Sequence, residues 1–138
     1  MSIAKNKANV KKFVEEVYNK ANWKMIPEVM TQEFAYRSAE GDVIGLEKVT
    51  PYFQMWHNAF PDVHATINNL IAEGDMVVAL LSFEGTLKGR LGDIAPTGKH
   101  MNMTGAFVSR HDTDGKQIET WQYVDYATMY KQLGIKAP

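Results

Sequence analysis

The chain has 138 residues, the usual size of one domain, so we expect a single domain over residues 1–138. Its 15 Lys and Arg against 16 Asp and Glu give a net charge of −1, without the basic excess typical of proteins that bind nucleic acid or anionic membranes. The absence of cysteine excludes disulfides and thiolate chemistry, and the first residues lack the apolar segment of a signal peptide, so we expect a cytoplasmic protein.

The first half of the chain is predicted to be mainly helical. Apolar residues recur from Val10 to Ala21 with the spacing of one stripe on a helix of about four turns. Thr50 and Pro51 form a favourable helix start, with Thr as N-cap and Pro in the first helical position. The expected elements are a helix over residues 10–21, a short helix over 22–30, a strand over 34–37, a turn over 40–42 and a helix over 50–60.

The second half is predicted to be mainly β-structure. Gly74-Asp75 and residues 112–115 have the composition of turns, and the glycine-rich segment 85–98 that of a loop. The expected elements are strands over 63–73 (bulged at Asn68-Asn69), 76–86, 99–111 and 116–126, and a terminal helical turn over 128–133. Helices followed by a strongly curved antiparallel sheet indicate the α+β class.

The last two long strands are predicted to form a hairpin. A four-residue loop at 112–115 places Phe107 opposite Thr120 and Gly105 opposite Gln122. A bulge between the strands would exchange their two faces beyond it. The more apolar face, which we assign to the interior, carries Met101, Met103, Gly105, Phe107, Ile118, Thr120, Gln122, Val124 and Tyr126.

Several short strings follow one another in a set order along the chain. They are Ala59-Phe60-Pro61-Asp62, Ala72-Glu73-Gly74-Asp75, Gly85-Thr86, Pro96-Thr97-Gly98-Lys99, Gly115-Lys116 before Trp121 and Asp125, and Gln132-Leu133-Gly134. Their order and spacing resemble the SnoaL-like polyketide cyclases, of the ester cyclase type, in the nuclear transport factor 2-like superfamily. The resemblance implies a cone, in which a curved antiparallel sheet wraps around N-terminal helices with an internal pocket. It also implies a homodimer through the outer sheet face, where Trp121 and Tyr123 lie among small and charged residues.

The resemblance further implies an intramolecular aldol reaction, which needs a carboxylate that moves a proton and a donor for the enolate oxygen. The position of the family's acid/base aspartate is occupied here by Gln122, and that of its supporting histidine by Phe107. A polar position on the third helix falls at about Tyr52, and the aromatic position of the first helix is kept as Tyr18. Because an amide is no base near neutral pH, we do not expect cyclisation by that mechanism.

Three tyrosines from separate elements, Tyr18, Tyr36 and Tyr52, are expected to project inward. They are either core aromatics whose hydroxyls bind the backbone, or a pocket wall that offers donors to a ligand oxygen. Gln122 is either a satisfied buried amide or a group that binds a ligand carbonyl. The residues expected to line a pocket are Tyr18, Tyr36, Tyr52, Trp56, Met103, Phe107 and Gln122.

Two candidate catalytic bases remain, Asp125 and His57. Asp125 either caps the helical turn that follows it or, if a bulge turns it inward, faces the pocket. His57 lies at the boundary of the apolar side of its helix, where a histidine is more often solvated than catalytic. No histidine has a partner at metal-ligand spacing and segment 85–98 lacks the features of a phosphate-binding loop, so we expect neither metal nor cofactor.

Three hypotheses follow. An enzyme would perform proton transfer, in a cyclisation, isomerisation or dehydration, on a hydrophobic carbonyl compound, with tyrosines as donors and Asp125 or His57 as base. A binding protein would hold a small hydrophobic molecule without converting it, and a dimerising scaffold would have a collapsed core. A carboxylate or imidazole inside the cavity distinguishes the first hypothesis from the second. In each case we expect no nucleic-acid or membrane partner.

Overall fold

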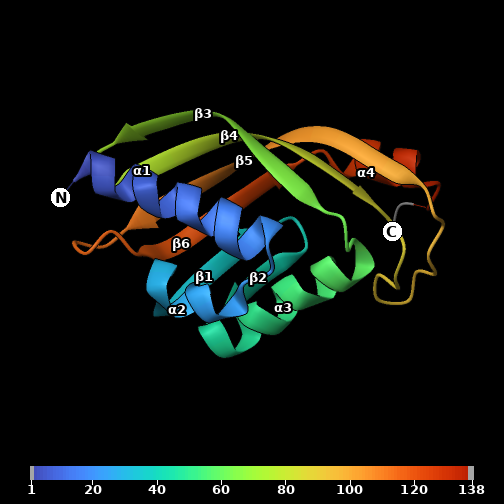
Figure 1. Ribbon diagram of the computed structural model, residues 1–138, viewed down its shortest axis with the longest axis horizontal. Helices are drawn as coiled ribbons and strands as arrows, with labels where there is room; N and C mark the ends of the chain where they lie inside the picture. The colour runs from blue at the N-terminus through green and yellow to red at the C-terminus, as the bar shows by residue number, and fades with distance from the viewer. Residues whose placement is uncertain (1, 137–138) are drawn as a thin grey trace.

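The structure is a computed structural model that describes residues 2–136. Its elements are α1 (Ile3–Lys12), a π-helix η1 (Phe13–Asn19), a 3-10 helix η2 (Trp23–Met25), α2 (Ile26–Val29), β1 (Met30–Ser38), β2 (Gly41–Ile44), α3 (Leu46–Ala59), β3 (His64–Glu73), β4 (Met76–Thr86), β5 (His100–His111), β6 (Gln117–Val124) and α4 (Tyr126–Leu133). Figure 1 shows the long strands β3 to β6 arching over the helices of the first half of the chain.

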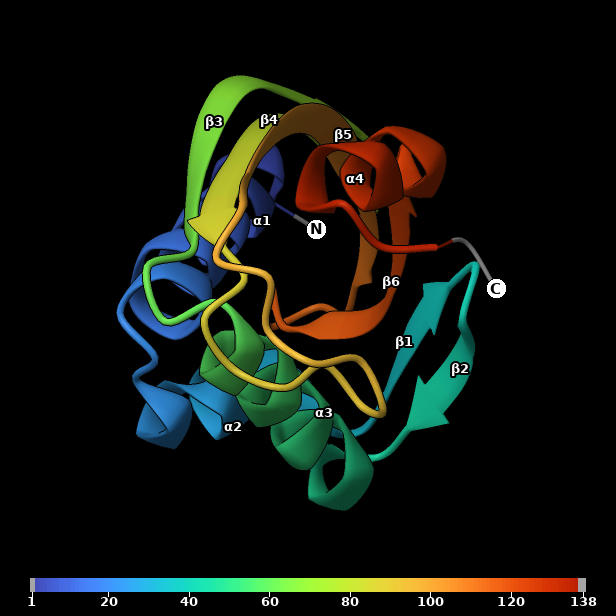
Figure 2. The same ribbon diagram turned by 90° about the vertical axis from the view of Figure 1, so that its right-hand side faces the viewer.

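One six-stranded sheet with the order β2-β1-β6-β5-β4-β3 forms the frame of the fold. Its neighbouring strands are antiparallel except for β1 and β6, which pair in parallel. The sheet is strongly curved, and Figure 2 shows α1 and α3 on its concave side. The α+β class with a curved sheet around helices is therefore confirmed, whereas the parallel pair departs from the antiparallel sheet that we expected.

Two helices, α1 and α3, begin a full turn or more before the residue that the sequence pattern predicts. The first starts at Ile3 because the Ser2 side chain caps it, accepting a hydrogen bond from the backbone N–H of Lys5 at 3.1 Å. The third starts at Leu46 after Gly45, so that Pro51 lies inside the helix instead of at its start. Leu46 and Val49 are buried, and their packing against the core explains the additional turn.

The register of the hairpin between β5 and β6 differs from the prediction. Phe107 pairs with Gln122 instead of Thr120, because the connection extends through residue 116 and the register shifts between Arg110 and His111. The difference is an even number of residues, so Phe107 and Gln122 still share the inward face. Ile118, which we expected inside, lies beside this irregularity and is 38% exposed.

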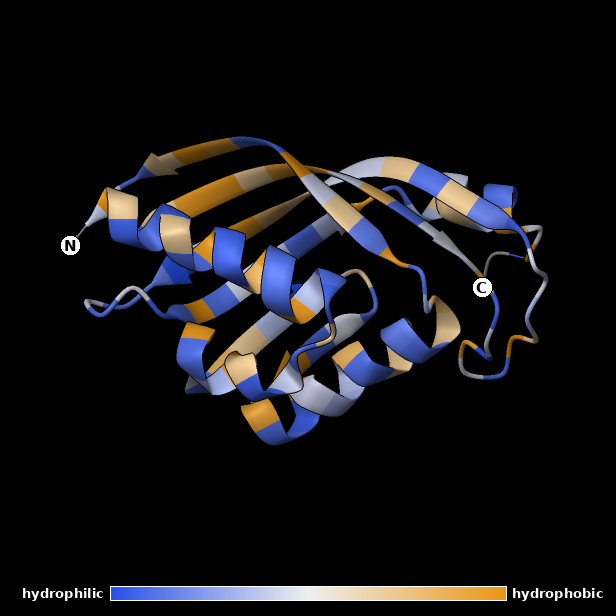
Figure 3. Ribbon diagram, in the orientation of Figure 1, coloured by the Kyte–Doolittle hydropathy of each residue, from blue (hydrophilic) through white to orange (hydrophobic). Residues whose placement is uncertain are grey.

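The core has two parts. The larger one lies between α1, η1, α3 and the sheet, and the smaller one joins α4 to the end of α3 and to the segment 87–99. In Figure 3, β4 carries the extended hydrophobic stretch that packs into the larger part. Segment 87–99 is anchored by the buried Leu87 and Leu91, and the backbone N–H groups of Lys88 and Gly89 donate to the carbonyl oxygen of Ala59 at the end of α3.

Candidate functional site

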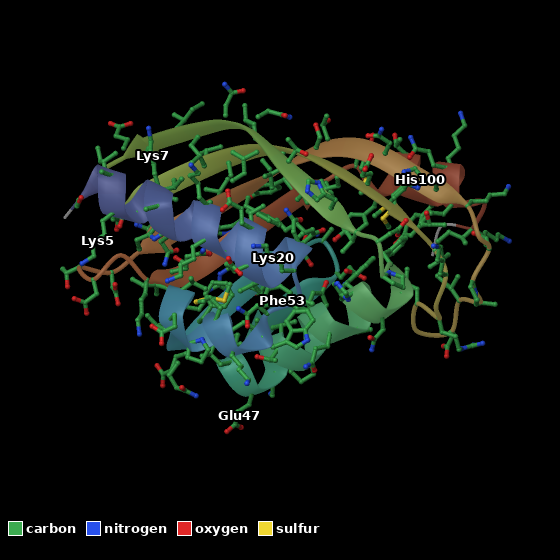
Figure 4. The ribbon with its side chains drawn as sticks, in the orientation of Figure 1. Lys5, Lys7, Lys20, Glu47, Phe53 and His100 are labelled. Carbon is green, nitrogen blue, oxygen red and sulfur yellow. The ribbon has the colours of Figure 1, made fainter. Side chains whose placement is uncertain are left out.

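A cavity of about 60 Å³ lies between η1, α3 and the inward faces of β5 and β6. Because one buried water needs about 10–15 Å³, the cavity has room for several waters or a small ligand group. Figure 4 shows Phe53 on α3, one of the lining residues, and Glu47 of the same helix directed away from the protein body. The lining consists of Phe13, Val17, Tyr18, Trp23, Tyr36, Tyr52, Phe53, Trp56, His57, Phe60, Val63, Phe83, Met101, Met103, Gln122, Val124, Tyr126 and Met129.

A chain of three side chains crosses the polar part of the cavity wall. The hydroxyl of Tyr36 donates a hydrogen bond to Oε1 of Gln122, and Nε2 of Gln122 donates to the hydroxyl oxygen of Tyr126 at 2.7 Å. The amide of Gln122 is thus held between two phenols. Since Tyr126 accepts in this chain, its own hydroxyl proton remains for another acceptor.

Tyr126 is a lining residue that our list of expected pocket residues omitted. The signal for it was present, because Tyr126 lies on the hairpin face that we assigned to the interior, four residues after Gln122. A strand period carried through residue 126 would have placed it beside the amide, although α4 begins at this residue.

The tyrosine hydroxyls of the cavity remain protonated at neutral pH. Burial raises the pKa of Tyr18 and Tyr36, and it raises the pKa of Tyr126 to about 12. The pKa of Tyr52 is raised by burial and by its hydrogen bond to Glu40, at 2.6 Å between the hydroxyl and Oε1. These phenols can therefore act as hydrogen-bond donors and acceptors, but not as phenolate bases.

Of the other residues expected in the pocket, Trp56 and Met103 line the cavity and Phe107 does not. Phe107 is 2% exposed and its ring packs against those of Phe13, Tyr18, Tyr36 and Phe83. All four of these residues line the cavity, so Phe107 acts as a core residue that supports the wall.

The two candidate bases lie in different surroundings. Asp125 is the N-cap of α4, where it accepts hydrogen bonds from the backbone N–H of Thr128 at 3.0 Å and from the Thr128 hydroxyl. These bonds lower the pKa of Asp125, and its side chain is outside the cavity lining. Asp125 therefore has the capping position that we considered for it, and its side chain does not face the cavity.

His57 lines the cavity. Its ring lies edge-on to that of Trp23, with centroids 5.7 Å apart and an interplanar angle of 90°. It is the one imidazole among the described lining residues, which include no Asp, Glu, Lys or Arg. An imidazole inside the cavity is the observation that keeps the enzyme hypothesis open.

Trp121 and Tyr123 lie on the convex face of the sheet, away from the cavity. Tyr123 is 59% exposed and Trp121 is half-buried next to it along β6. Ile71 and Leu80, on β3 and β4, are further large apolar residues that are exposed.

A row of charges crosses the same convex face. Glu119 lies between Arg37 at 3.0 Å and Arg110 at 3.2 Å, and these arginines also contact Asp42 and Asp75, respectively. These ion pairs link β2, β1, β6 and β5 at one end of the sheet. Both arginines therefore lie on the convex face and not in the cavity.

No helix within residues 2–136 combines the length and the apolar character needed to cross a bilayer. In the same residues, no three or more His, Asp or Glu side chains come together as ligands for a metal ion.

Known proteins resemble this chain in both sequence and fold. The sequence profile of a family described as SnoaL-like polyketide cyclase matches residues 8–133. A proposed SnoaL-like polyketide cyclase from Jannaschia sp. CCS1 is 19% identical, with a TM-score of 0.90 over 99% of this chain and 98% of that one. No curated protein matches the chain significantly.

Two other solved structures show that proteins of this fold are assigned to different reactions. A proposed polyketide cyclase from Acidithiobacillus ferrooxidans is 26% identical, with a TM-score of 0.83 over 97% of this chain and 98% of that one. AclR, a proposed hydroxylase from Streptomyces galilaeus, is 23% identical, with a TM-score of 0.83 over 99% of this chain and 100% of that one.

Proposed function

Because the chain belongs to the SnoaL-like polyketide cyclase family, whose profile covers residues 8–133, we propose that its cavity binds a small, largely apolar carbonyl compound and moves a proton on it. The observation that carries this proposal is the chain from Tyr36 through Gln122 to Tyr126, which leaves one hydroxyl proton for a ligand acceptor. A carbonyl oxygen is the acceptor that fits a wall otherwise made of aromatic and aliphatic groups.

The reaction that this wall supports is enolisation. The imidazole of His57 takes a proton from the carbon next to the carbonyl group. The electron pair of that C–H bond forms a C=C bond to the carbonyl carbon, and the π electron pair of the C=O bond moves onto the oxygen. Tyr126 stabilises the resulting enolate oxygen by a hydrogen bond and keeps its own proton, because burial raises its pKa to about 12. Return of the proton to another carbon gives an isomer, and attack of the enolate carbon on a second carbonyl closes a ring.

A second function is binding without conversion. It is supported by two positions at which this chain lacks the acid/base residues that the family resemblance implies. Gln122 and Phe107 occupy the positions where the family resemblance implies an acid/base pair, and Asp125 caps α4. His57 is then the one remaining base at the described cavity wall, and a binding protein does not need it.

Ligand binding, which both functions require, is tested with acetophenone and its shape analogue α-methylstyrene, in which a methylene replaces the oxygen. We expect acetophenone to shift the NMR signals of the Gln122 side-chain amide and to bind about tenfold more tightly than α-methylstyrene. Native mass spectrometry of freshly purified protein then identifies any molecule that remains bound.

Catalysis is tested by the exchange of the acetophenone methyl protons for deuterium in D₂O. We expect the wild type to accelerate this exchange and His57→Asn to lose at least 90% of the acceleration, whereas the control Asp125→Asn, which keeps an N-cap, remains active. Binding without accelerated exchange establishes the second function. Binding of neither compound refutes both.

We also propose a homodimer through the convex face around Trp121 and Tyr123. The exposed Tyr123, Ile71 and Leu80 supply the apolar part of such an interface. Light scattering on the eluting protein is expected to give about twice the chain mass of 15.6 kDa, and Tyr123→Glu should return the monomer. The control Ile44→Glu changes an equally exposed apolar residue on β2 and should leave the dimer intact.

A further inference from the structure

We propose that Glu40, in the turn between β1 and β2, selects against anionic ligands of the cavity and thereby determines its preference for neutral carbonyl compounds. This inference rests on the proposed ligand-binding function. Glu40 was not among the residues that the sequence pattern singled out.

Glu40 is attached to the cavity wall through Tyr52. Its Oε1 accepts a hydrogen bond from the hydroxyl of Tyr52 at 2.6 Å, and the Tyr52 ring lines the cavity. The turn itself is held by a hydrogen bond from the backbone N–H of Glu40 to the hydroxyl oxygen of Ser38 at 3.2 Å. The carboxylate is therefore held beside the wall, although it does not line the cavity.

No positive charge in the described wall offsets this carboxylate. None of the cavity-lining residues is Lys or Arg, and no described basic side chain forms an ion pair with Glu40. Arg37, three residues earlier, contacts Asp42 and Glu119 instead. Glu40 is exposed, but its carboxylate is thus a negative charge joined to the cavity wall without a cation in the described wall to offset it.

The charge of Glu40 also acts on the tyrosines around the cavity. After burial, the charge of Glu40 contributes to the raised pKa of Tyr126 and Tyr130, and it adds to the raised pKa of Tyr36 and Tyr52. The repulsion that disfavours a phenolate at these positions acts equally on a carboxylate carried by a ligand.

The hydrogen bond to Glu40 adds a second barrier to anions. The hydroxyl of Tyr52 has one proton, and Glu40 accepts it, so Tyr52 cannot donate to a ligand carboxylate without breaking the bond at 2.6 Å. A neutral ketone needs one donor, which Tyr126 provides, whereas a carboxylate needs several to replace its hydration. Both effects favour the ketone.

The test compares acetophenone with benzoate, which has a similar shape and carries a negative charge. Dissociation constants are measured by NMR titration of wild type, Glu40→Gln and Glu40→Lys at low ionic strength. The Gln side chain can still accept the Tyr52 proton, so only the charge is removed. The control Glu47→Gln removes an equal charge from the first turn of α3, where the side chain points into solvent (Figure 4).

We expect Glu40→Gln to tighten benzoate binding relative to acetophenone by roughly fivefold, and Glu40→Lys by more, with a smaller change at high salt. Glu47→Gln should leave the ratio unchanged. A ratio that is the same in wild type and Glu40→Gln overturns this inference alone, because acetophenone binding still supports the proposed function. Binding of no probe to the wild type overturns both.

Discussion

Acidification below pH 6.5 is expected to destabilise the fold through one buried histidine. His111 is 1% exposed at the end of β5, where its Nδ1 lies 2.9 Å from the carbonyl oxygen of Gly115 and its Nε2 lies 2.8 Å from the hydroxyl of Ser109. A carbonyl oxygen can only accept, so Nδ1 carries the proton and Nε2 accepts from Ser109. Both nitrogens are satisfied by the neutral ring.

The sign and size of the effect follow from this arrangement. Burial lowers the pKa of His111 below its ordinary value of 6.5, so the unfolded chain binds a proton in a pH range where the folded chain does not. The free energy of unfolding therefore falls as pH falls from 6.5 towards the lower pKa of the folded state. If the ring stays neutral in the folded state, the loss reaches about 2 kcal/mol at pH 5.

Urea unfolding followed by Trp fluorescence, at intervals between pH 7.5 and pH 5, measures this loss. His111→Asn keeps a donor for the carbonyl oxygen of Gly115 but cannot be protonated, so its free energy of unfolding should change much less over the same range. It should also be lower at pH 7.5 by about 1–3 kcal/mol, because the smaller side chain leaves a cavity beside Ser109. An equal pH dependence in wild type and His111→Asn would refute the assignment to His111.

Three further predictions concern the cavity and its supports. Tyr126→Phe removes the free hydroxyl proton, so acetophenone should bind about fivefold to tenfold more weakly by NMR titration while α-methylstyrene is unaffected. Asp125→Ala should lower the free energy of unfolding in urea by about 1 kcal/mol through loss of the N-cap, whereas Asp125→Asn should cost much less. Gly89→Ala should destabilise by more than about 1 kcal/mol in the same assay, because a Cβ there would lie 2.3 Å from the carbonyl oxygen of Asn58; an unchanged stability would mean that segment 87–99 can move away from α3.

Much of the fold was readable from local signals. The hydrophobic strand 76–86 has the bounds expected from its turn residues, and the irregularity near Asn68-Asn69 occurs where two polar residues interrupt β3. Asp125 directly before a predicted helical turn is a favourable capping position, and in the structure its carboxylate accepts a hydrogen bond from the backbone N–H of Thr128. These features depend on a few neighbouring residues, so the sequence suffices to locate them.

The composition, the periodicity and the ordered strings of the sequence therefore determined the α+β class, the family resemblance and the inward face of Gln122. Only the tertiary structure decided that α3 starts at Leu46, that β1 pairs in parallel with β6, and that Glu40 contacts Tyr52. It also decided that His57, and not Asp125, lines the cavity. The physical reason is that such contacts join residues far apart in the chain, and their geometry depends on how the whole core packs instead of on any local preference.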